Sequence, residues 1–200
     1  DGNGGGGEYR DWRRDNKNKG LSIQLSKLMK VRQIIAMEKT KETEQLIEQS
    51  LNQDKKVIVF TNFTAPLLKI YEKYKKNAVI LNGTMKKEDR QKSVDRFQND
   101  DNIKVFIGNV KAAGVGITLT AAEVVIFNDL SFVPSDMSQC EDRAFRIGQD
   151  KKVSCLYPIY ENTIERKIYD IVNNKKSVID TVMGDNIEDE DIMSEIVSML

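Results

Sequence analysis

The sequence predicts an α/β protein with a mostly parallel sheet that helices cover on both faces. Three observations indicate this class: five short apolar segments rich in β-branched residues, helical periodicity between them, and 40% hydrophobic with 31% charged residues in a chain of 200. Strands that are apolar throughout are buried on both faces, and parallel strands need a crossover helix between them. The pattern therefore favours an open layered fold with right-handed crossovers.

Each element follows from its own stretch of sequence. Between Leu21 and Leu51, apolar residues recur at helical spacing without glycine or proline, which predicts two helices or one broken helix. Beyond Leu51, apolar runs alternate with segments of helical periodicity. We expect strands at 55–60, 78–82, 103–109, 123–129 and 153–159, and helices at 64–76, 86–98, 134–145 and 162–182.

The expected domain boundaries follow changes in composition. The first residues, DGNGGGG, are typical of a flexible linker or a cut end, and they suggest a piece of a longer protein. No lysine or arginine follows Lys176, whereas seven acidic residues do. We expect a flexible linker at 1–20, a helical lead-in at 21–52, the α/β lobe at 53–161, a C-terminal helix at 162–183 and an acidic tail at 184–200.

Composition argues against several functional classes. The chain has no histidine, which excludes Ser-His and Cys-His nucleophile pairs, and its two cysteines, Cys140 and Cys155, lack metal-binding spacing. No apolar run approaches the roughly 18 to 20 residues that span a bilayer, so we expect no membrane partner and a cytoplasmic protein. Residues 1–176 carry 31 basic and 24 acidic residues, a net charge of +7 that is compatible with a polyanionic partner.

Four loops follow the predicted strands, at the edge where functional groups of open α/β folds gather. Glycine lets backbone N–H groups approach a phosphate, and threonine, asparagine, lysine and arginine are common side-chain donors to it. Glycines occur in the second and third loops, and each of the four loops has at least one of these donor types, so together they predict a phosphate-binding edge. The loops are TNFT (61–64), NGTMKKEDR (82–90), GNVKAAGVGITLT (108–120) and NDLSFVPSD (128–136).

The glycines in the third loop do not make a complete nucleotide site. Gly114 and Gly116 would need a third glycine at position 119 for a dinucleotide fingerprint, and Leu119 stands there. The sequence also has no GxxxxGK[ST] loop and no acidic box after an apolar strand. The chain alone therefore cannot hold a nucleoside triphosphate and its magnesium ion in the P-loop manner.

The stretch QCEDRAFRIGQ (139–149) indicates how such a site could be completed. On an α-helix, Gln139, Arg143 and Arg146 fall within about 60° of arc. A solvated helix face with Glu141 and Asp142 as salt-bridge partners explains the same spacing. Arginine is always protonated and offers a planar fork of donors to phosphoryl oxygens. If a partner lobe held ATP and Mg²⁺, this stretch would supply arginine fingers to the γ-phosphate.

Four segments together resemble the C-terminal helicase motifs of the Swi/Snf family of superfamily-two ATP-dependent DNA translocases. They occur in family order and spacing, the resemblance covers about residues 21–183, and QCEDRAFRIGQ is its most diagnostic part. GVGITLTAAEVVIFNDLSFVP is similar to the annealing-helicase branch. The segments are VIVFTNFT, LNGTMKKEDRQKSVDRF, VFIGNVKAAGVGITLTAAEVVIFNDLSFVPSDMSQCEDRAFRIGQ and VSCLYPIYENTIERKIYDIV.

The resemblance implies a RecA-like second lobe, ATP hydrolysis at the cleft between two lobes, and translocation on double-stranded or branched DNA. It implies that a missing N-terminal P-loop lobe mainly holds ATP and Mg²⁺, that residues 162–183 form a brace helix, and that the protein is nuclear in a eukaryote or nucleoid-associated in a prokaryote or virus. Arg143 and Arg146 would be catalytic, and Gln139, Gly114 and Gly116 would bind ATP. The expected DNA contacts are Thr61, Asn62, Gly83, Thr84, Arg90, Asn109, Lys111, Thr118 and Phe132.

Three positions depart from the family pattern. Phe145 replaces a histidine, Phe132 replaces the tryptophan of a WNP triplet, and Lys111 replaces an arginine. Phe132 keeps an aromatic surface for stacking on a base or sugar, and Lys111 keeps a charge. Two other functions fit the residues: a nucleic-acid-binding α/β module without an ATPase partner, and a small-molecule nucleotide-binding protein whose glycine loop is the whole site.

Overall fold

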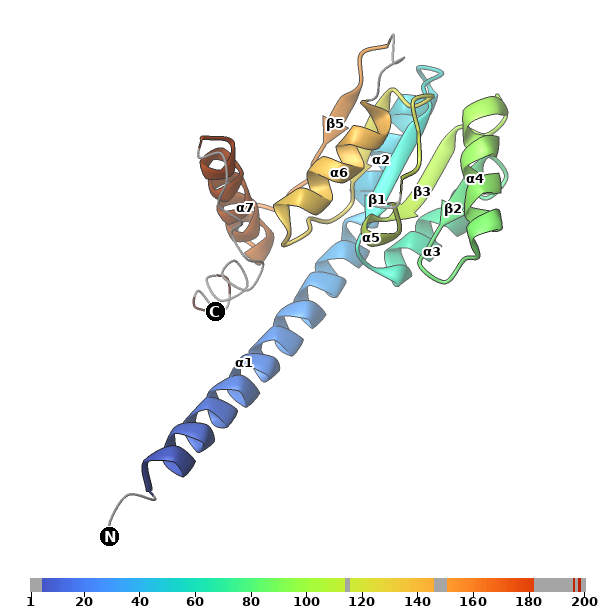
Figure 1. Cartoon of the computed structure of the whole chain (residues 1–200). Helices are drawn as coiled ribbons and strands as arrows, with labels where there is room; N and C mark the ends of the chain where they lie inside the picture. Colours follow the sequence, from blue (N-terminus) through green and yellow to red (C-terminus); the bar gives the residue numbers. More distant parts are fainter. Residues whose placement is uncertain (1–4, 114–115, 146–150, 182–195, 197, 199–200) are drawn as a thin grey trace.

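The computed structural model describes residues 5–113, 116–145, 151–181, 196 and 198. Its centre is a parallel sheet with the strand order β2-β3-β1-β4-β5 (Figure 1). This arrangement confirms the predicted parallel α/β fold, because each strand lies where an apolar segment predicted it. The strands are β1 (Val57–Thr61), β2 (Ala78–Leu81), β3 (Val105–Asn109), β4 (Val124–Phe127) and β5 (Ser154–Leu156).

The helices alternate with the strands, as the periodicity predicted. The short helix α5 was not predicted, because four residues in a glycine-bearing loop carry too little periodicity to detect. None of the helices in the described residues combines the length and the apolar run that crossing a membrane requires. The helices are α1 (Gly5–Glu38), α2 (Thr40–Leu51), α3 (Thr64–Tyr74), α4 (Lys87–Asn99), α5 (Val110–Ala113), α6 (Pro134–Ala144) and α7 (Ile164–Thr181).

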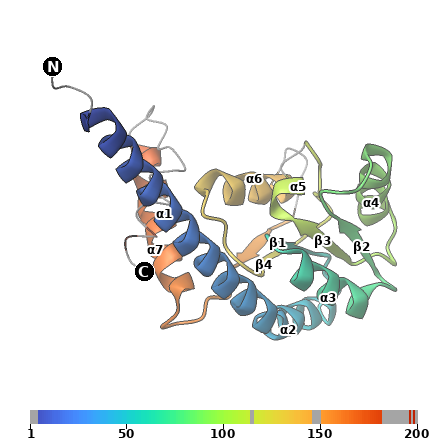
Figure 2. The same ribbon diagram turned by 90° about the horizontal axis from the view of Figure 1, so that it is seen from below.

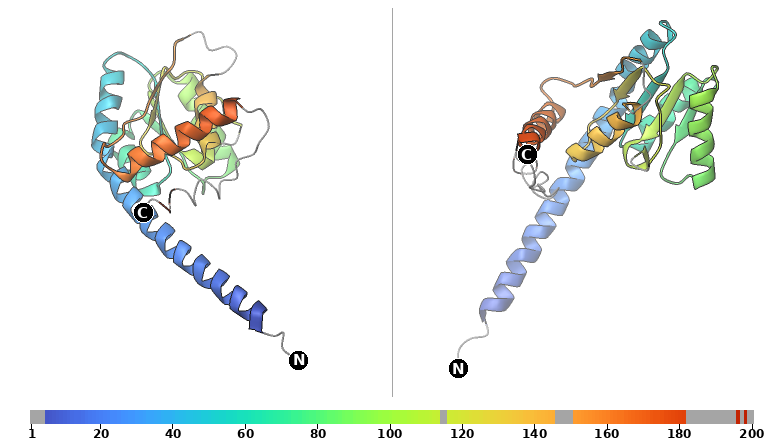
Figure 3. Two further views of the ribbon diagram at one scale, coloured as in Figure 1. Left: turned by 90° about the vertical axis from the view of Figure 1, so that its left-hand side faces the viewer. Right: turned by 45° about the horizontal axis from the view of Figure 1, so that its top comes forward.

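The helical lead-in is longer than expected. Residues 5–20, predicted as a flexible linker, form the first turns of α1, which extend away from the sheet (Figure 3). Adding residues to a helix that is already nucleated costs far less than starting one, and the packed part of α1 supplies the nucleus. A single turn residue, Lys39, separates α1 from α2, which confirms the expected break in the lead-in.

Side chains alternate between the two faces of each central strand and form two cores. Ile58 and Phe60 of β1 pack with Phe97 of α4 on one face, together with residues of α6 and α7. Val57 and Val59 face the other way and pack with α2 and α3. Figure 2 shows the sheet between these two helix layers. The central strands are thus buried on both sides, as their continuous apolar sequences predicted.

Candidate functional site

The register of the sheet brings the four loops to one edge. Thr61, which ends β1, pairs with Asn109, which ends β3. Leu81 ends β2 and pairs with Gly108, while β4 ends beside β1 at Phe127. Because all these strands run in the same direction, the loops that follow them start at the same edge of the sheet.

A buried carboxylate at this edge joins two of the loops. Asp129, two residues after β4, is 2% exposed. Its Oδ1 accepts hydrogen bonds from the backbone N–H of Asn62 at 2.9 Å and from Asn62 Nδ2 at 2.7 Å. Its Oδ2 accepts from the hydroxyl of Thr61 and from Asn128 Nδ2 at 3.4 Å. The carboxylate therefore organises the loop after β1.

Thr61 and Asn62, both predicted to contact DNA, differ in their placement. Thr61 is fully buried and its hydroxyl donates to Asp129, so this side chain is not accessible to a phosphate of DNA. Asn62 is half-buried, and its backbone carbonyl accepts a hydrogen bond from Asn109 Nδ2 at 3.1 Å. Asn62 and Asn109 thus lie together at the carboxyl edge, as predicted.

The loop after β2 is held by its own side chains. The Nε of Arg90 donates to the carbonyl of Met85 at 3.0 Å, and one terminal nitrogen donates to the carbonyl of Gly83 at 2.8 Å. Asn82 Oδ1 accepts from both the backbone N–H and the hydroxyl of Thr84. Gly83 and Thr84 are exposed and Arg90 is half-buried. Arg90 therefore shapes the loop with two of its five donors.

The loop after β3 is connected to α6. Lys111 in α5 is exposed, and its backbone N–H donates to Asn109 Oδ1 at 3.2 Å. Gly116 has φ +49°, a conformation that favours glycine, with open space where a Cβ would be. Thr118 is half-buried, and the N–H of the next residue, Leu119, donates to the carbonyl of Arg143 at 2.9 Å. Gly114 lies outside the described residues.

Helix α6 carries Gln139 and Arg143 four residues apart, so they share a face. Gln139 is exposed and Arg143 is half-buried. The helix ends at Ala144, and the exposed Phe145 leaves helical geometry at φ −91° and ψ 69°. Arg146 lies outside the described residues, so the expected common face with Arg146 stays a prediction.

A tyrosine beside β5 and a buried cysteine of α6 hold this helix against the sheet. The ring of Tyr157, just after β5, stacks on Phe127 with centroids 4.9 Å apart. The hydroxyl of Tyr157 donates to Glu141 of α6, and burial first, then this carboxylate, raises the pKa of Tyr157. Cys140, on the buried face of α6, packs into the core, and desolvation raises the pKa of its thiol to about 12. Arg143 therefore extends from a helix that is fixed to the core.

Phe132 does not offer the stacking surface that its position predicted. It is 9% exposed, and the guanidinium of Arg32 lies 3.9 Å from its ring centroid. The same guanidinium lies 5.4 Å from the ring centroid of Phe63 and donates to the carbonyl of Leu130. A phenylalanine has a smaller ring than the tryptophan of the family pattern and no N–H, and this one is covered by α1. Desolvation by burial lowers the pKa of Arg32.

Sequence reasoning missed the buried polar residues that connect the lead-in to the lobe. Lys39 Nζ lies 2.7 Å from Glu165 Oε1 of α7, with side chains 0% and 5% exposed. Desolvation lowers the pKa of Lys39, and Glu165 opposes that shift. Arg32 follows the buried Leu28 by one turn of α1, and Lys39 lies seven residues after Arg32, at the turn that ends the helix. Their positions in the apolar stripe were the signal that could have identified them.

The described residues do not provide a metal site of their own. No three His, Cys, Asp or Glu side chains among them lie close enough together to hold an ion. The buried carboxylate of Asp129 has its two oxygens occupied by amide and hydroxyl donors. The described residues therefore offer no ligand set for Mg²⁺.

The chain is similar to known proteins over more than half of its length. Residues 38–148 match the family described as "Helicase conserved C-terminal domain". The chain is 36% identical over 135 residues to SWI/SNF-related matrix-associated actin-dependent regulator of chromatin subfamily A-like protein 1 of Drosophila melanogaster. It is 35% identical over 152 residues to the ATP-dependent helicase FUN30 of Saccharomyces cerevisiae. These matches cover 66% and 74% of this chain.

A solved structure shares the fold. The Sulfolobus solfataricus SWI2/SNF2 ATPase core in complex with dsDNA aligns with a TM-score of 0.67 and 29% sequence identity, covering 82% of this chain. The chain spans 38% of that core, and 18% and 13% of the Drosophila and Saccharomyces proteins. The parallel sheet and the family match agree with one another. The chain therefore belongs to the helicase C-terminal domain family, in its Swi/Snf branch.

Proposed function

We propose that this chain is the second motor lobe of a DNA-dependent ATPase that couples ATP hydrolysis to translocation on double-stranded DNA, of the remodelling or annealing type. The observation that carries the proposal is the connection between α6 and the strand-end loops. The carbonyl of Arg143 accepts a hydrogen bond from Leu119, in the loop that follows β3 and α5. The helix that carries Arg143 is thus hydrogen-bonded to a loop at the edge of the sheet where side chains that can donate to a phosphate gather.

In the proposed site, Arg143 and Arg146 act as arginine fingers on a γ-phosphate that an N-terminal P-loop lobe holds with Mg²⁺. Gln139 lies one helical turn before Arg143 and would contact the same nucleotide, with Gly114 and Gly116 in the adjoining loop. Arginine neutralises charge on the phosphoryl oxygens without changing its own protonation, which lowers the barrier to transfer. Support comes from the names of relatives, which include an ATP-dependent helicase.

The DNA-contacting part of the proposal uses the exposed and half-buried members of the edge. Asn62 follows β1, Asn109 ends β3, and Lys111 lies in α5, which follows β3. The placement of Thr61 and Phe132 in the interior removes both from this set. The remaining candidates are Gly83, Thr84 and Arg90 in the loop after β2, and Thr118 in the loop after β3.

The partners follow from the same proposal. They are the P-loop lobe of the same polypeptide and double-stranded or branched DNA, and the solved relative in complex with dsDNA supports a duplex. Such a protein would be nuclear in a eukaryote and nucleoid-associated in a prokaryote or virus. The Drosophila relative, named as a regulator of chromatin, supports the nuclear alternative for a eukaryotic source.

The decisive experiment replaces the arginines in the two-lobed parent. Arg146→Ala should reduce DNA-stimulated ATP hydrolysis by about 10³ to 10⁵, the range of arginine fingers in comparable enzymes, while ATP and DNA binding persist. Arg143→Ala should behave similarly or slightly more mildly. Lysine at either position should restore little, because it lacks the bidentate fork. Steady-state turnover and equilibrium binding of both ligands are the measurements.

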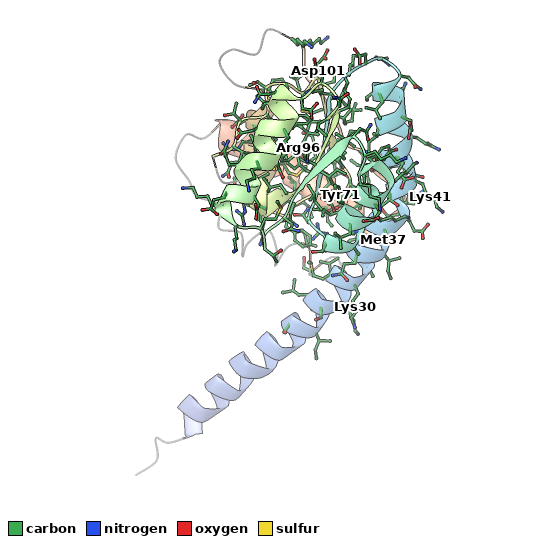
Figure 4. The ribbon with its side chains drawn as sticks, turned by 90° about the vertical axis from the view of Figure 1, so that its right-hand side faces the viewer. Lys30, Met37, Lys41, Tyr71, Arg96 and Asp101 are labelled. Carbon is green, nitrogen blue, oxygen red and sulfur yellow. The ribbon has the colours of Figure 1, made fainter. Side chains whose placement is uncertain are left out.

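A matched control separates catalysis from folding. Arg96 is exposed on α4, within the sequence of the same lobe (Figure 4). Arg96→Ala should leave turnover near that of the parent, and thermal melting of the isolated chain should be unchanged by all three alanine variants to within a few degrees. Normal turnover by the Arg143 and Arg146 variants, or loss of the folded lobe, would contradict the arginine-finger proposal.

A further inference from the structure

This inference rests on the proposed function and concerns how the DNA-contacting edge is held in shape. The four hydrogen bonds of the buried Asp129 carboxylate divide by oxygen. Both donors from Asn62, its backbone N–H and its Nδ2, go to Oδ1. The donors from Thr61 and Asn128 go to Oδ2. One oxygen therefore fixes both the backbone and the side chain of Asn62.

This arrangement determines what Asn62 can offer a ligand. A primary amide has two N–H donors, and Asp129 engages one of them. The engaged donor selects the flip and the rotamer of the Asn62 amide, so the second N–H has a defined direction at the half-buried edge. Asn109 Nδ2 donates to the Asn62 carbonyl from the neighbouring strand end and fixes the same backbone from the other side.

We propose that Asp129 is a positioning residue, which holds the Asn62 amide in the orientation that lets its second N–H donate to a DNA phosphate. Asp129 itself is 2% exposed and negatively charged, so it does not touch the DNA. It acts by removing the rotamer freedom that Asn62 would otherwise lose on binding. A purely stabilising carboxylate would change the melting temperature and leave DNA affinity as it is.

The division by oxygen distinguishes two substitutions of Asp129. Asparagine can present its carbonyl oxygen at the Oδ1 position, where it accepts both donors from Asn62, and its amide nitrogen at the Oδ2 position, where it can donate to the Thr61 hydroxyl. Alanine removes all four bonds. We therefore expect Asp129→Asn to keep the DNA Kd of the two-lobed parent within about twofold, and Asp129→Ala to weaken it about tenfold, as expected for losing one hydrogen bond to a charged group.

The test is a double-mutant cycle on DNA affinity in the two-lobed parent. If Asp129 acts through Asn62, then Asn62→Ala and Asp129→Ala should weaken the Kd to a similar extent, and the double variant should be no weaker than Asn62→Ala alone. The DNA concentration for half-maximal ATPase stimulation should rise in step with the Kd, while kcat at saturating DNA stays near that of the parent. These two readouts separate positioning from loss of active protein.

Asn128→Ala is the matched control. Asn128 is buried beside Asp129, but its stronger hydrogen bonds go to the lead-in: it accepts from the Thr43 hydroxyl at 2.8 Å and donates to the Ala36 carbonyl at 3.0 Å. Its replacement should lower the melting temperature and leave the DNA Kd unchanged. If Asp129→Ala does not yield folded protein, Asp129→Ser takes its place, because its hydroxyl keeps a polar group in the site but ends one bond short of both carboxylate oxygens.

Each outcome decides the matter. Non-additive losses with retained kcat support positioning, whereas multiplicative losses, or full affinity in the alanine or serine variant, overturn it. A tenfold loss in Asp129→Asn also overturns it, because the carbonyl oxygen should be sufficient. If Asn62→Ala binds DNA normally, Asn62 is no contact and the inference fails. If the two-lobed parent itself shows no DNA-stimulated ATP hydrolysis, the proposed function is refuted. The same ATPase assay tests this before any variant is compared.

Discussion

At the scale of single residues, burial decides which predicted side chains remain available to a ligand. Thr61 and Phe132 carry suitable chemistry, but one donates to Asp129 and the other is covered by the guanidinium of Arg32. Asn62 comes from the same loop as Thr61, whereas Asn109 ends β3 and Lys111 lies in α5, and all three stay exposed or half-buried. The sequence indicates the loop, but the distribution of inward and outward positions within an irregular loop has no period from which it could be predicted.

Cys140 allows a prediction about alkaline stability. Desolvation raises the pKa of its thiol from 9.0 to about 12, so the folded chain holds this proton more tightly than the unfolded chain. The resulting stabilisation is complete below pH 9 and is lost as the pH rises from 9 towards 12. Cys140→Ala should therefore lose free energy of unfolding less steeply above pH 9, by up to about 1.4 kcal/mol per pH unit.

Urea unfolding of both proteins at pH 8, 9, 10 and 10.5 measures this difference. Alanine also leaves a smaller side chain in the core, which lowers stability by a constant amount at every pH. The slope of stability against pH is therefore the informative quantity, since all other titrating groups are common to the two proteins. Parallel slopes would show that the Cys140 thiol ionises as easily in the folded chain as in the unfolded one.

At the scale of elements, the sequence predicted those that bury a regular apolar pattern. Strands such as 57–61 and helices such as 87–99 were found because continuous β-branched runs and a 3.6-residue period are strong signals. The four-residue α5 and the helical start of α1 were missed, since neither stretch of sequence carries such a pattern. The pairing of Lys39, at the turn between α1 and α2, with α7 was also beyond prediction, because it joins residues 126 positions apart.

That pairing predicts strong coupling between the lead-in and α7. Lys39→Met leaves the Glu165 carboxylate buried without its cation, which should lower the free energy of unfolding by about 3 to 5 kcal/mol. Replacing both partners, Lys39→Met with Glu165→Leu, should recover much of this loss, because no charge is then left buried. Urea denaturation of the isolated chain gives all three values.

Lys41 provides the comparison for that series. It is close to Lys39 in sequence, lies at the start of α2 (Figure 4), and pairs with Glu38 at 3.5 Å with both side chains largely exposed. Lys41→Met should change the free energy of unfolding by less than about 0.5 kcal/mol. Equal losses for Lys39→Met and Lys41→Met would mean that the buried pair has no special role.

At the scale of the whole molecule, the chain contains one half of the proposed ATP site. It has no GxxxxGK[ST] loop in its 200 residues, and it spans 38% of the solved Sulfolobus core that it resembles. The basic body, with a net charge of +7 over residues 1–176, suits a polyanion. Under the proposed function, binding of DNA is a property that this lobe can show alone, whereas hydrolysis needs the other lobe.

We therefore expect the isolated chain to hydrolyse ATP at a negligible rate, with or without DNA. It should bind duplex DNA weakly and without sequence preference, and log K should fall with log salt at a slope of about −0.9 for each phosphate neutralised. Coupled-enzyme turnover and a salt titration of binding are the measurements. Clear steady-state hydrolysis by carefully purified chain would refute the shared site, and salt-insensitive binding would refute the phosphate contacts.

The parallel direction of the strands also determines where the lobe can be labelled without disturbing it. All site loops leave the sheet at one edge, so the turns that lead into the strands lie at the opposite edge, about 15 Å away for strands of four or five residues. Asp101 is exposed in the turn before β3, far from Lys30 and the carboxyl edge in Figure 4. A fluorophore attached at Asp101→Cys would report lobe closure in the two-lobed parent from outside the interface.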